Sequence, residues 1–425
     1  MLTAVSRYGG RFVPNLDEVV EECRRRGQLS QGPCIAEFEE ALARRLGGGR
    51  ALTTSYGRMA AYSIFKALEL PPGSEIVFPA LTFWVVPEMA RAAGYKVVFA
   101  DVDPATFNLD PASLERAIGP RTRALVPTHI YGLPCDMDAI MAIARRHHLK
   151  VVEDCAHTLG ATYHGQPVGT FGDAAFFSFQ LLKPLNTLGG GAAFTRDPAL
   201  AERLAALVRA DPWPTPRSVL RRARLGKLER FLTSPAGFTL TAFPLLWAAS
   251  WLKVRPDAWL WEKIRSLRPL PGGYHERYSN MQAALGLAGL ERLVAWNETT
   301  RAHARLMSAA LADVPCVGVP PDPSDRVHLY YQYCLYVPDR EALVQGCLRR
   351  GLDIEYHHMD ICSDLPLFEE ARCEARGARR TADAVQIPIH AALDAGQVAA
   401  VARRLRRALV GRAADVQPST ARLTR

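Results

Sequence analysis

One acid and one lysine stand out in residues 151–195, because each follows an apolar run typical of a buried strand. The first run ends in Asp154, and a second, residues 174–179, is followed by Lys183 in a stretch otherwise poor in charge. Three glycines, 189–191, close the segment. A lysine can form an imine once its environment lowers its pKa, and an acid can hold a pyridine nitrogen protonated so that the ring becomes an electron sink. Together, Asp154 and Lys183 suit a ring-shaped cofactor. Taken alone, Lys183 is equally well explained as a surface lysine, and Asp154 as a helix N-cap.

The residues around this pair form a long motif. From Glu153 to Lys183 the chain reads E-D-C-A-H-x-x-G-A-x-x-x-G-x-x-V-G-x-x-G-D-A-x-x-F-S-F-x-x-x-K. This motif resembles the signature of the DegT/DnrJ/EryC1/StrS family, pyridoxal-phosphate (PLP) aminotransferases that act mostly on nucleotide-linked keto-sugars. The segments L-x-x-G-P at 29–33 and GYHERYSNMQAA at 273–284 resemble further motifs in the family's order. The resemblance covers residues 27–409, nearly the whole chain.

The resemblance implies a set of site residues. Lys183 would hold PLP as an imine and carry a proton between substrate and cofactor during ping-pong transfer, and Asp154 would hold the protonated ring nitrogen. The remaining cofactor-binding residues that it implies are Gly57 and Arg58 at a helix start, Phe83 stacked on the ring, His157 near the ring oxygen, Ser178 on the phosphate, and His275 supplied by the partner subunit. A glycine turn into a helix N-terminus also suits an anion by its free N–H groups and dipole. No metal site is predicted.

Several positions depart from the family pattern. Arg58 stands where threonine is commoner, and His275 stands where asparagine is usual. Gln180, Pro184 and Leu188 alter the substrate side of the lysine loop. The particular sugar is therefore not carried over from the family.

The elements that must position these residues alternate between strand and helix over residues 51–195. Such alternation predicts a largely parallel sheet covered on both faces, with sites at the carboxyl ends of its strands. The resemblance implies an α/β fold, the fold type I of PLP-dependent transferases, with a large PLP-binding domain and a small C-terminal α/β domain. The predicted divisions are an N-terminal segment 1–30, the large domain 31–281, a long helix and small domain 282–411, and a disordered tail 412–425.

The composition sets the class. A chain of 425 residues, 48% hydrophobic and 22% charged, can bury two or three domains. Nine cysteines without a C-x-x-C pair favour neither disulfides nor zinc, and the N-terminus lacks the apolar core of a signal peptide, so a cytoplasmic protein is expected. The net charge of +9 comes mostly from residues 217–268, and no nucleic-acid motif accompanies it.

Residues 212–271 break the α/β pattern and predict an insertion in the large domain. Residues 217–268 hold eleven Lys/Arg against three acids, and residues 232–252 carry no charge. Five of the seven tryptophans lie in the insertion. Basic residues beside tryptophans suit an anionic membrane surface, here its inner face, or a lipid-linked substrate held there. Pro235 and Pro244 argue against a span, and packing against a partner subunit or over an apolar cleft remains the alternative.

The sequence therefore predicts a homodimeric PLP aminotransferase with glutamate as donor and a nucleotide- or lipid-linked keto-sugar as acceptor. An intact Lys183 favours transamination over the dehydration carried out by relatives that lack it. A non-catalytic protein of this fold, used for regulation or scaffolding, and a PLP-dependent sugar-modifying enzyme of another reaction type remain as alternatives.

Overall fold

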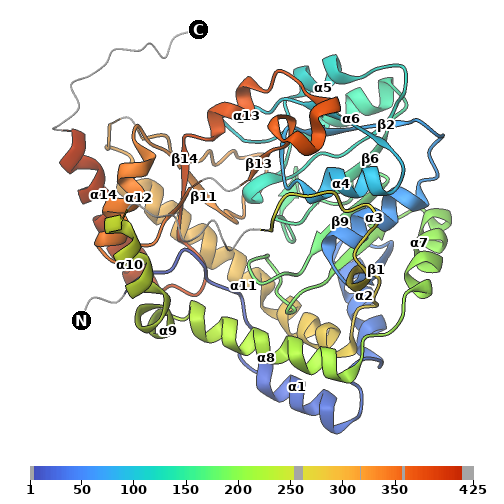
Figure 1. Cartoon of the computed structure of the whole chain (residues 1–425), viewed down its shortest axis with the longest axis horizontal. Coiled ribbons are helices and arrows are strands. Elements are labelled where there is room, and N and C mark those ends of the chain that lie inside the picture. The colour runs from blue at the N-terminus through green and yellow to red at the C-terminus, as the bar shows by residue number, and fades with distance from the viewer. Residues whose placement is uncertain (1–3, 253–261, 316, 357–358, 414–425) are drawn as a thin grey trace.

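The computed structural model describes residues 4–252, 262–315, 317–356 and 359–413 (Figure 1). Its centre is a seven-stranded sheet in the order β1-β10-β9-β6-β5-β2-β4. The strands are β1 (Arg50–Thr54), β2 (Glu75–Pro79), β4 (Lys96–Ala100), β5 (Thr122–Leu125), β6 (Lys150–Asp154), β9 (Ala174–Ser178) and β10 (Gly191–Thr195). The five from β9 to β4 are parallel, and β10 and β1 extend the sheet in antiparallel pairs. The predicted α/β class with a mostly parallel sheet is confirmed.

Helices cover both faces of this sheet because its strands are apolar on both sides. Adjacent strand residues point to opposite faces, so Ile76 packs in one core with α3, α4 and α7, while Val77 packs in the other with α2, α5, α6 and the long helix α11 (Asn280–Leu311). The helices are α1 (Leu16–Arg25), α2 (Cys34–Arg45), α3 (Gly57–Ala67), α4 (Val85–Ala92), α5 (Pro111–Ala117), α6 (Met137–Arg146) and α7 (Pro198–Ala210). Short strand pairs join β3 (Leu81–Thr82) to β13 (Asp360–Ile361) and β7 (Thr162–Tyr163) to β8 (Gln166–Pro167).

The 32-residue helix α11 (Asn280–Leu311) connects the large sheet to a smaller one. It starts with a capping box in which the Ser279 and Gln282 side chains satisfy backbone groups reciprocally. Its far end packs under an antiparallel sheet, β11-β14-β12. The small region consists of β11 (Tyr333–Tyr336), α12 (Arg340–Arg349), β12 (Glu355–Tyr356), α13 (Arg376–Thr381), β14 (Ala384–Ile387) and α14 (Ala395–Ala413). The predicted tail lies outside the described residues, except for 412 and 413, which end α14.

The first described residues pair with the small region. Val5 forms a parallel bridge with Leu352, and the buried Arg7 side chain donates to Asp353 at 2.6 Å. The N-terminal segment therefore packs along the small region before α1 begins.

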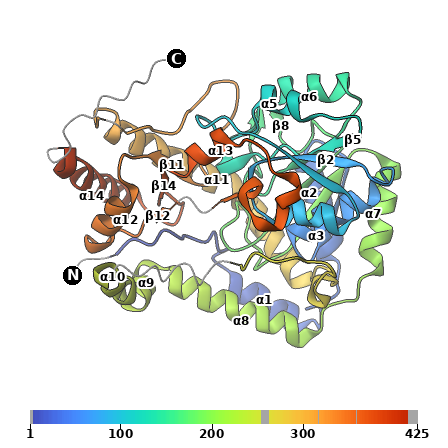
Figure 2. The ribbon, with the colours of Figure 1, turned by 45° about the horizontal axis from the view of Figure 1, so that its top comes forward.

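Within the predicted insertion, residues 216–252 are almost entirely helical, whereas residues 262–271 form neither helix nor strand. The insertion forms α8 (Pro216–Thr233), α9 (Pro235–Leu240) and α10 (Ala242–Leu252), and Trp259 and Trp261 lie outside the described residues. These helices follow one edge of the molecule in both views (Figures 1 and 2). Over the described part of the chain, we find no helix with the length and apolar character needed to cross a bilayer.

Candidate active site

The carboxyl ends of β6 and β9 open onto a cavity of about 430 Å³. The two strands are parallel neighbours, with Asp154 opposite Phe176, so Asp154 and Ser178 end at the same edge of the sheet. The loop after β9 returns Lys183 to this edge. Of the eight residues predicted from the sequence, those that line the cavity are Gly57, Arg58, Phe83, Asp154, His157, Ser178 and Lys183.

Asp154 is a buried carboxylate. Burial raises its pKa to about 6, even though the Ala156 N–H, which donates to its Oδ1 at 3.0 Å, and the charge of Lys183 both favour the ionised form. An acid in such a place strongly favours a cationic partner. A protonated ring nitrogen is a partner of that kind.

Lys183 has the opposite shift. Burial lowers its pKa to about 8, and the Arg58 charge lowers it further, while Asp154 opposes the change. Its Nζ lies 5.0 Å from the centroid of the Tyr331 ring. A lysine with this pKa is partly a free amine near neutral pH and is a competent nucleophile and proton carrier.

The start of α3 forms the other end of the cavity. Its N-cap residue, Tyr56, makes no side-chain capping bond, which leaves the first backbone N–H groups without a side-chain acceptor among the described residues. A Cβ on Gly57 would meet the Ser178 Cβ at 2.8 Å, so only glycine lets the helix start this close to β9. A Cβ on Gly191 would likewise come too close to the Gly57 backbone. The helix N-terminus and the Ser178 hydroxyl together suit a phosphate.

Arg58 lies beside this end and is already paired. Its Nη1 donates to Glu262 at 2.8 Å and to the Tyr274 hydroxyl at 2.6 Å. Its guanidinium also lies 5.6 Å from the Phe83 ring centroid. Glu262, from the end of the insertion, thus lines the cavity beside Arg58.

His157 is held as part of an aromatic stack. Its ring lies parallel to Tyr331 with centroids 4.1 Å apart, and its Nδ1 accepts a hydrogen bond from the Tyr131 N–H at 3.3 Å. The ring is therefore fixed in the cavity wall.

His275 does not reach the cavity of its own chain. It is half exposed, and its Nδ1 lies 3.2 Å from Asp211. His275 is thus the one of the eight predicted residues that does not line this cavity.

Residues that the sequence did not single out also line the cavity. Tyr331 contacts both His157 and Lys183, and Asp360 accepts a 3.3 Å hydrogen bond from the Trp84 N–H. Both lie far along the chain from the motif, and no local pattern marks them. The antiparallel pair β3–β13 brings Asp360 beside Phe83.

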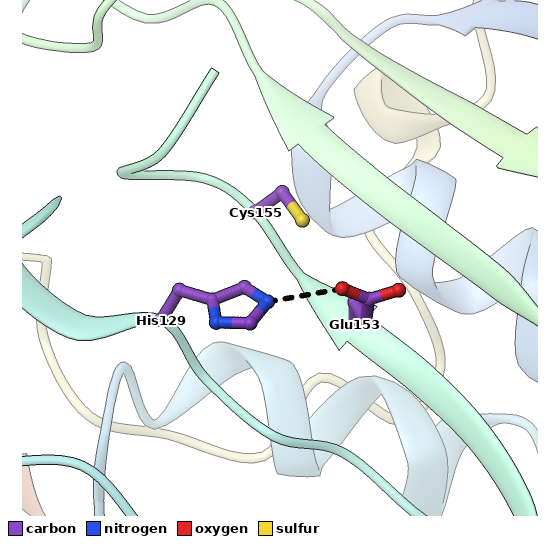
Figure 3. Close-up of side chains that lie close together, drawn as sticks. All are labelled: His129, Glu153 and Cys155. Atoms are coloured by element: carbon purple, nitrogen blue, oxygen red, sulfur yellow. Dashed lines mark hydrogen bonds and ion pairs between the residues drawn. The ribbon is translucent and has the colours of Figure 1, made fainter. Parts of the chain in front are cut away.

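His129, Glu153 and Cys155 form a buried cluster (Figure 3), and two of them, Glu153 and Cys155, flank Asp154 in the sequence. The donor atoms of the cluster lie within 4.8 Å of one another, but the Glu153 carboxylate is already committed. It accepts the backbone N–H groups of Gly169, Phe171 and Gly172 at 2.7–2.8 Å and lies 3.2 Å from His129 Nε2. These bonds fasten the loop between β8 and β9 to the strand that carries Asp154, so a positioning role explains the cluster.

Taken together, the cavity fits PLP. An uncapped helix start with Ser178 offers a phosphate site, while the buried Asp154 and the low-pKa Lys183 line the same space. The donor set matches an aromatic cofactor with one anionic arm, one basic ring nitrogen and one reactive carbonyl.

Comparisons with known proteins point the same way. The model of the DegT/DnrJ/EryC1/StrS aminotransferase family matches residues 13–212 and 253–406. The chain is 30% identical to the pleiotropic regulatory protein of Geobacillus stearothermophilus, covering 80% of this chain and 78% of that protein. It is 34% identical to GDP-perosamine synthase of Caulobacter vibrioides, covering 69% and 66%. Among solved structures, the aminotransferase TlmJ from Streptoalloteichus hindustanus superposes with a TM-score of 0.78 at 25% identity, covering 96% and 99%.

Proposed function

Because this chain belongs to the DegT/DnrJ/EryC1/StrS aminotransferase family, we propose that it moves an amino group from glutamate to the keto group of a nucleotide- or lipid-linked sugar. Aminotransferase activity, PLP as cofactor and sugars as substrates follow from the family and from relatives such as GDP-perosamine synthase. The donor, the carrier on the sugar and the residue roles are our proposal. One observation carries it: Lys183 and Asp154, with opposite pKa shifts, line the same cavity as the uncapped start of α3.

Each residue has a defined task in this proposal. Bound PLP supplies an electron sink for the reacting carbon. Lys183 Nζ would hold the cofactor at rest; once the amino donor has displaced it, it would carry the proton from the donor carbon that bears nitrogen to a carbon of the cofactor. In the second half-reaction it would carry a proton back, from that carbon to the sugar carbon that gains nitrogen. Asp154 keeps a proton on the ring nitrogen, because an ionised carboxylate in a buried site favours an adjacent cation.

The remaining residues bind and orient the cofactor. The Gly57 and Arg58 backbone N–H groups and the Ser178 hydroxyl hold the phosphate, and the Arg58 side chain supports them with its charge. Phe83 packs on the ring. His157, fixed by its stack on Tyr331, faces the ring oxygen.

We also propose that the active unit is a homodimer in which His275 contacts the partner's phosphate site. Half-exposed His275 lies outside its own cavity, and two-fold dimers are the commonest assembly.

A mixing experiment tests whether His275 acts in the partner's site. Lys183→Ala and His275→Ala subunits, each inactive or weak alone, form one intact site per mixed dimer, so random exchange should restore about a quarter of wild-type activity. If mixing restores nothing although pull-down through a tag on one variant shows that mixed dimers form, His275 acts within its own chain.

A regulatory role without catalysis is the second candidate, because one relative carries a regulatory name. The perturbed Lys183 and Asp154 favour catalysis, since a purely regulatory protein gains nothing from burying both. A sugar-modifying reaction of another type is disfavoured by the intact lysine.

A donor and acceptor screen with mass detection tests the proposal. The purified holoenzyme, incubated with glutamate and a panel of nucleotide-linked keto-sugars, should yield an aminated sugar and 2-oxoglutarate. Production of 2-oxoglutarate without an aminated sugar would keep the donor and reject the acceptor class. Bound PLP that no amino donor converts would support the regulatory candidate instead.

A further inference from the structure

Helices α8, α9 and α10 form a surface that the family does not account for. The family model matches residues up to 212 and resumes at 253, so it omits the segment that these helices occupy. Most of the large apolar side chains that the described structure leaves exposed lie here. We call the following residues the insertion face: Arg217, Arg221, Arg224, Leu225, Leu228, Phe231, Leu232, Leu240, Leu245, Trp247 and Trp251.

Helix α8 separates a packed side from an open side. Val219, Ala223 and Gly226 are buried, and a Cβ on Gly226 would meet Leu188 at 2.4 Å. Leu188 belongs to the loop that follows Lys183, so α8 packs directly behind that loop. The helix is therefore mounted on the body of the enzyme.

The exposed side chains of α8 include one stripe along the helix, which is basic in its first half and apolar in its second. Spacings of three and four residues place members of the stripe on one helical face. Arg217, Arg221 and Arg224 make its first half, and Leu228 and Phe231 are in its second. Among the described residues, no carboxylate forms an ion pair with those three arginines. The stripe therefore exposes apolar side chains next to three arginines that have no acidic partner among the described residues.

Helix α10 continues this surface and is apolar all round. Its eleven residues, AFPLLWAASWL, carry no charge, yet Leu245 is 74% exposed and Trp247 and Trp251 are also exposed. One side is anchored to the small region: Arg349 donates to the Ser250 carbonyl, and its guanidinium lies 4.2 Å from the centroid of the Trp251 ring. Exposed large apolar side chains that gather on successive helices mark a candidate interaction site.

We propose that the insertion face docks on an anionic lipid surface. Apolar side chains and tryptophans enter the headgroup boundary, where an apolar ring and a polar N–H are both satisfied. The three arginines lie where they meet anionic headgroups. This is the arrangement of a helix lying in the interface. Helix α10 alone would be about 16 Å long, roughly half the apolar thickness of a bilayer, so the face lies on the membrane.

A second copy of the chain is a poorer occupant. In a two-fold contact the same patch meets itself, so the arginine half of one copy would face either the arginine half of the other copy or its apolar half, where the guanidinium groups would be buried without a partner. Like charges facing each other oppose association. An anionic surface complements both halves of the face.

Vesicle co-sedimentation of the full-length holoenzyme tests the proposal. We expect binding to phosphatidylcholine vesicles that contain phosphatidylglycerol, weaker binding to phosphatidylcholine alone, and loss of binding as sodium chloride is raised. Replacing two arginines, Arg221→Gln with Arg224→Gln, should weaken partitioning about thirtyfold. Leu245→Ser, at a side chain with little packing, should also weaken it. Absence of binding at low salt overturns the proposal.

The matched control removes two exposed arginines from the opposite edge of the molecule. Arg116→Gln with Arg145→Gln, on α5 and α6, makes the same change in net charge far from the insertion face (Figures 1 and 2). This variant should bind vesicles nearly as the wild type does. If it loses binding equally, net charge and not the face is responsible. Light scattering supplies the last arm: if Leu245→Ser or Leu228→Ser lowers the oligomeric state, the face covers a second copy and the lipid proposal is wrong.

Discussion

Asp154 and Lys183 shift each other's pKa across one cavity. The Asp154 carboxylate raises the pKa of Lys183, and the Lys183 ammonium lowers the pKa of Asp154. Burial is the larger effect at both sites and leaves the pKa of Asp154 at about 6 and that of Lys183 at about 8. Burial therefore leaves each group less charged than it would be in water, and a suitable ligand would stabilise it. A cationic ring nitrogen would satisfy the acid, and a carbonyl carbon would satisfy the amine.

Lys183→Ala should abolish turnover, by at least about a thousandfold, because it removes the nucleophile and the proton carrier together. The fold should survive, since Lys183 lies on a loop at the cavity edge. Steady-state kinetics and the thermal melting curve measure the two effects. Lys150→Ala, which removes an exposed lysine paired with Asp173, is the control and should keep its rate. Wild-type turnover in Lys183→Ala would show that the site is elsewhere.

Asp154→Asn should lose about 3 kcal/mol of transition-state stabilisation, roughly 150-fold in kcat/KM. The amide cannot hold a proton on the ring nitrogen as an ionised carboxylate does. Asp138→Asn, on the exposed start of α6, should be near normal. Equal rates in these two variants would remove Asp154 from the site.

Asp154→Asn should also raise the free energy of unfolding of the cofactor-free protein. The folded pKa of Asp154, about 6, exceeds its ordinary value of 3.8, so the folded state binds the proton more tightly than the unfolded state does. The stability linked to that proton is present below about pH 4 and is lost as pH rises through about 6. Relative to wild type, Asp154→Asn should gain up to about 3 kcal/mol in free energy of unfolding above about pH 6, and little near pH 4. Urea unfolding at several pH values measures this, and a gain independent of pH would contradict the shifted pKa.

Capture of PLP by the cofactor-free protein should accelerate with a midpoint near pH 8, because only the neutral form of Lys183 is nucleophilic. Arg58→Gln should move the midpoint up, since the Arg58 charge lowers the lysine pKa. Asp154→Asn should move it down, since the Asp154 charge raises that pKa. The cofactor's absorbance change in stopped flow gives the rate, and pyridoxal without phosphate separates the pKa effect from phosphate binding. Midpoints that do not move in opposite directions would rule out this pairing.

Glu153→Gln should lower the free energy of unfolding by about 2–3 kcal/mol. The carboxylate accepts three backbone N–H groups, and the NH₂ of glutamine cannot accept any of those it faces. Glu115→Gln, which removes a partly exposed pair with His147, should cost less than about 1 kcal/mol. Equal losses in the two variants would show that the loop between β8 and β9 does not depend on Glu153.

The amino-acid sequence by itself determined the local chemistry and the class of fold. Alternating apolar runs and helix signals predict a sheet whose carboxyl edge carries Asp154 and Ser178, and neighbouring parallel strands place such ends together. Gly57 is predictable because a glycine turn that leads into a helix N-terminus suits an anion; its close contact with Ser178 is known only from the structure. Lys183 is marked by its motif, so the residues closest to the proposed chemistry can be identified from sequence patterns alone.

Tertiary structure alone decided what closes the cavity and what faces outward. Glu262, Tyr331 and Asp360 lie 79, 148 and 177 residues after Lys183 along the chain, and only the packing of the end of the insertion, the small region and β13 brings them to the cavity. The sequence of α8 does not say which side is buried, because glycine and alanine carry no strong preference. That side is settled by Leu188, which Gly226 admits at close range. Local patterns fix periodicity and backbone conformation, whereas the choice of neighbour depends on surfaces that exist only once the chain has folded.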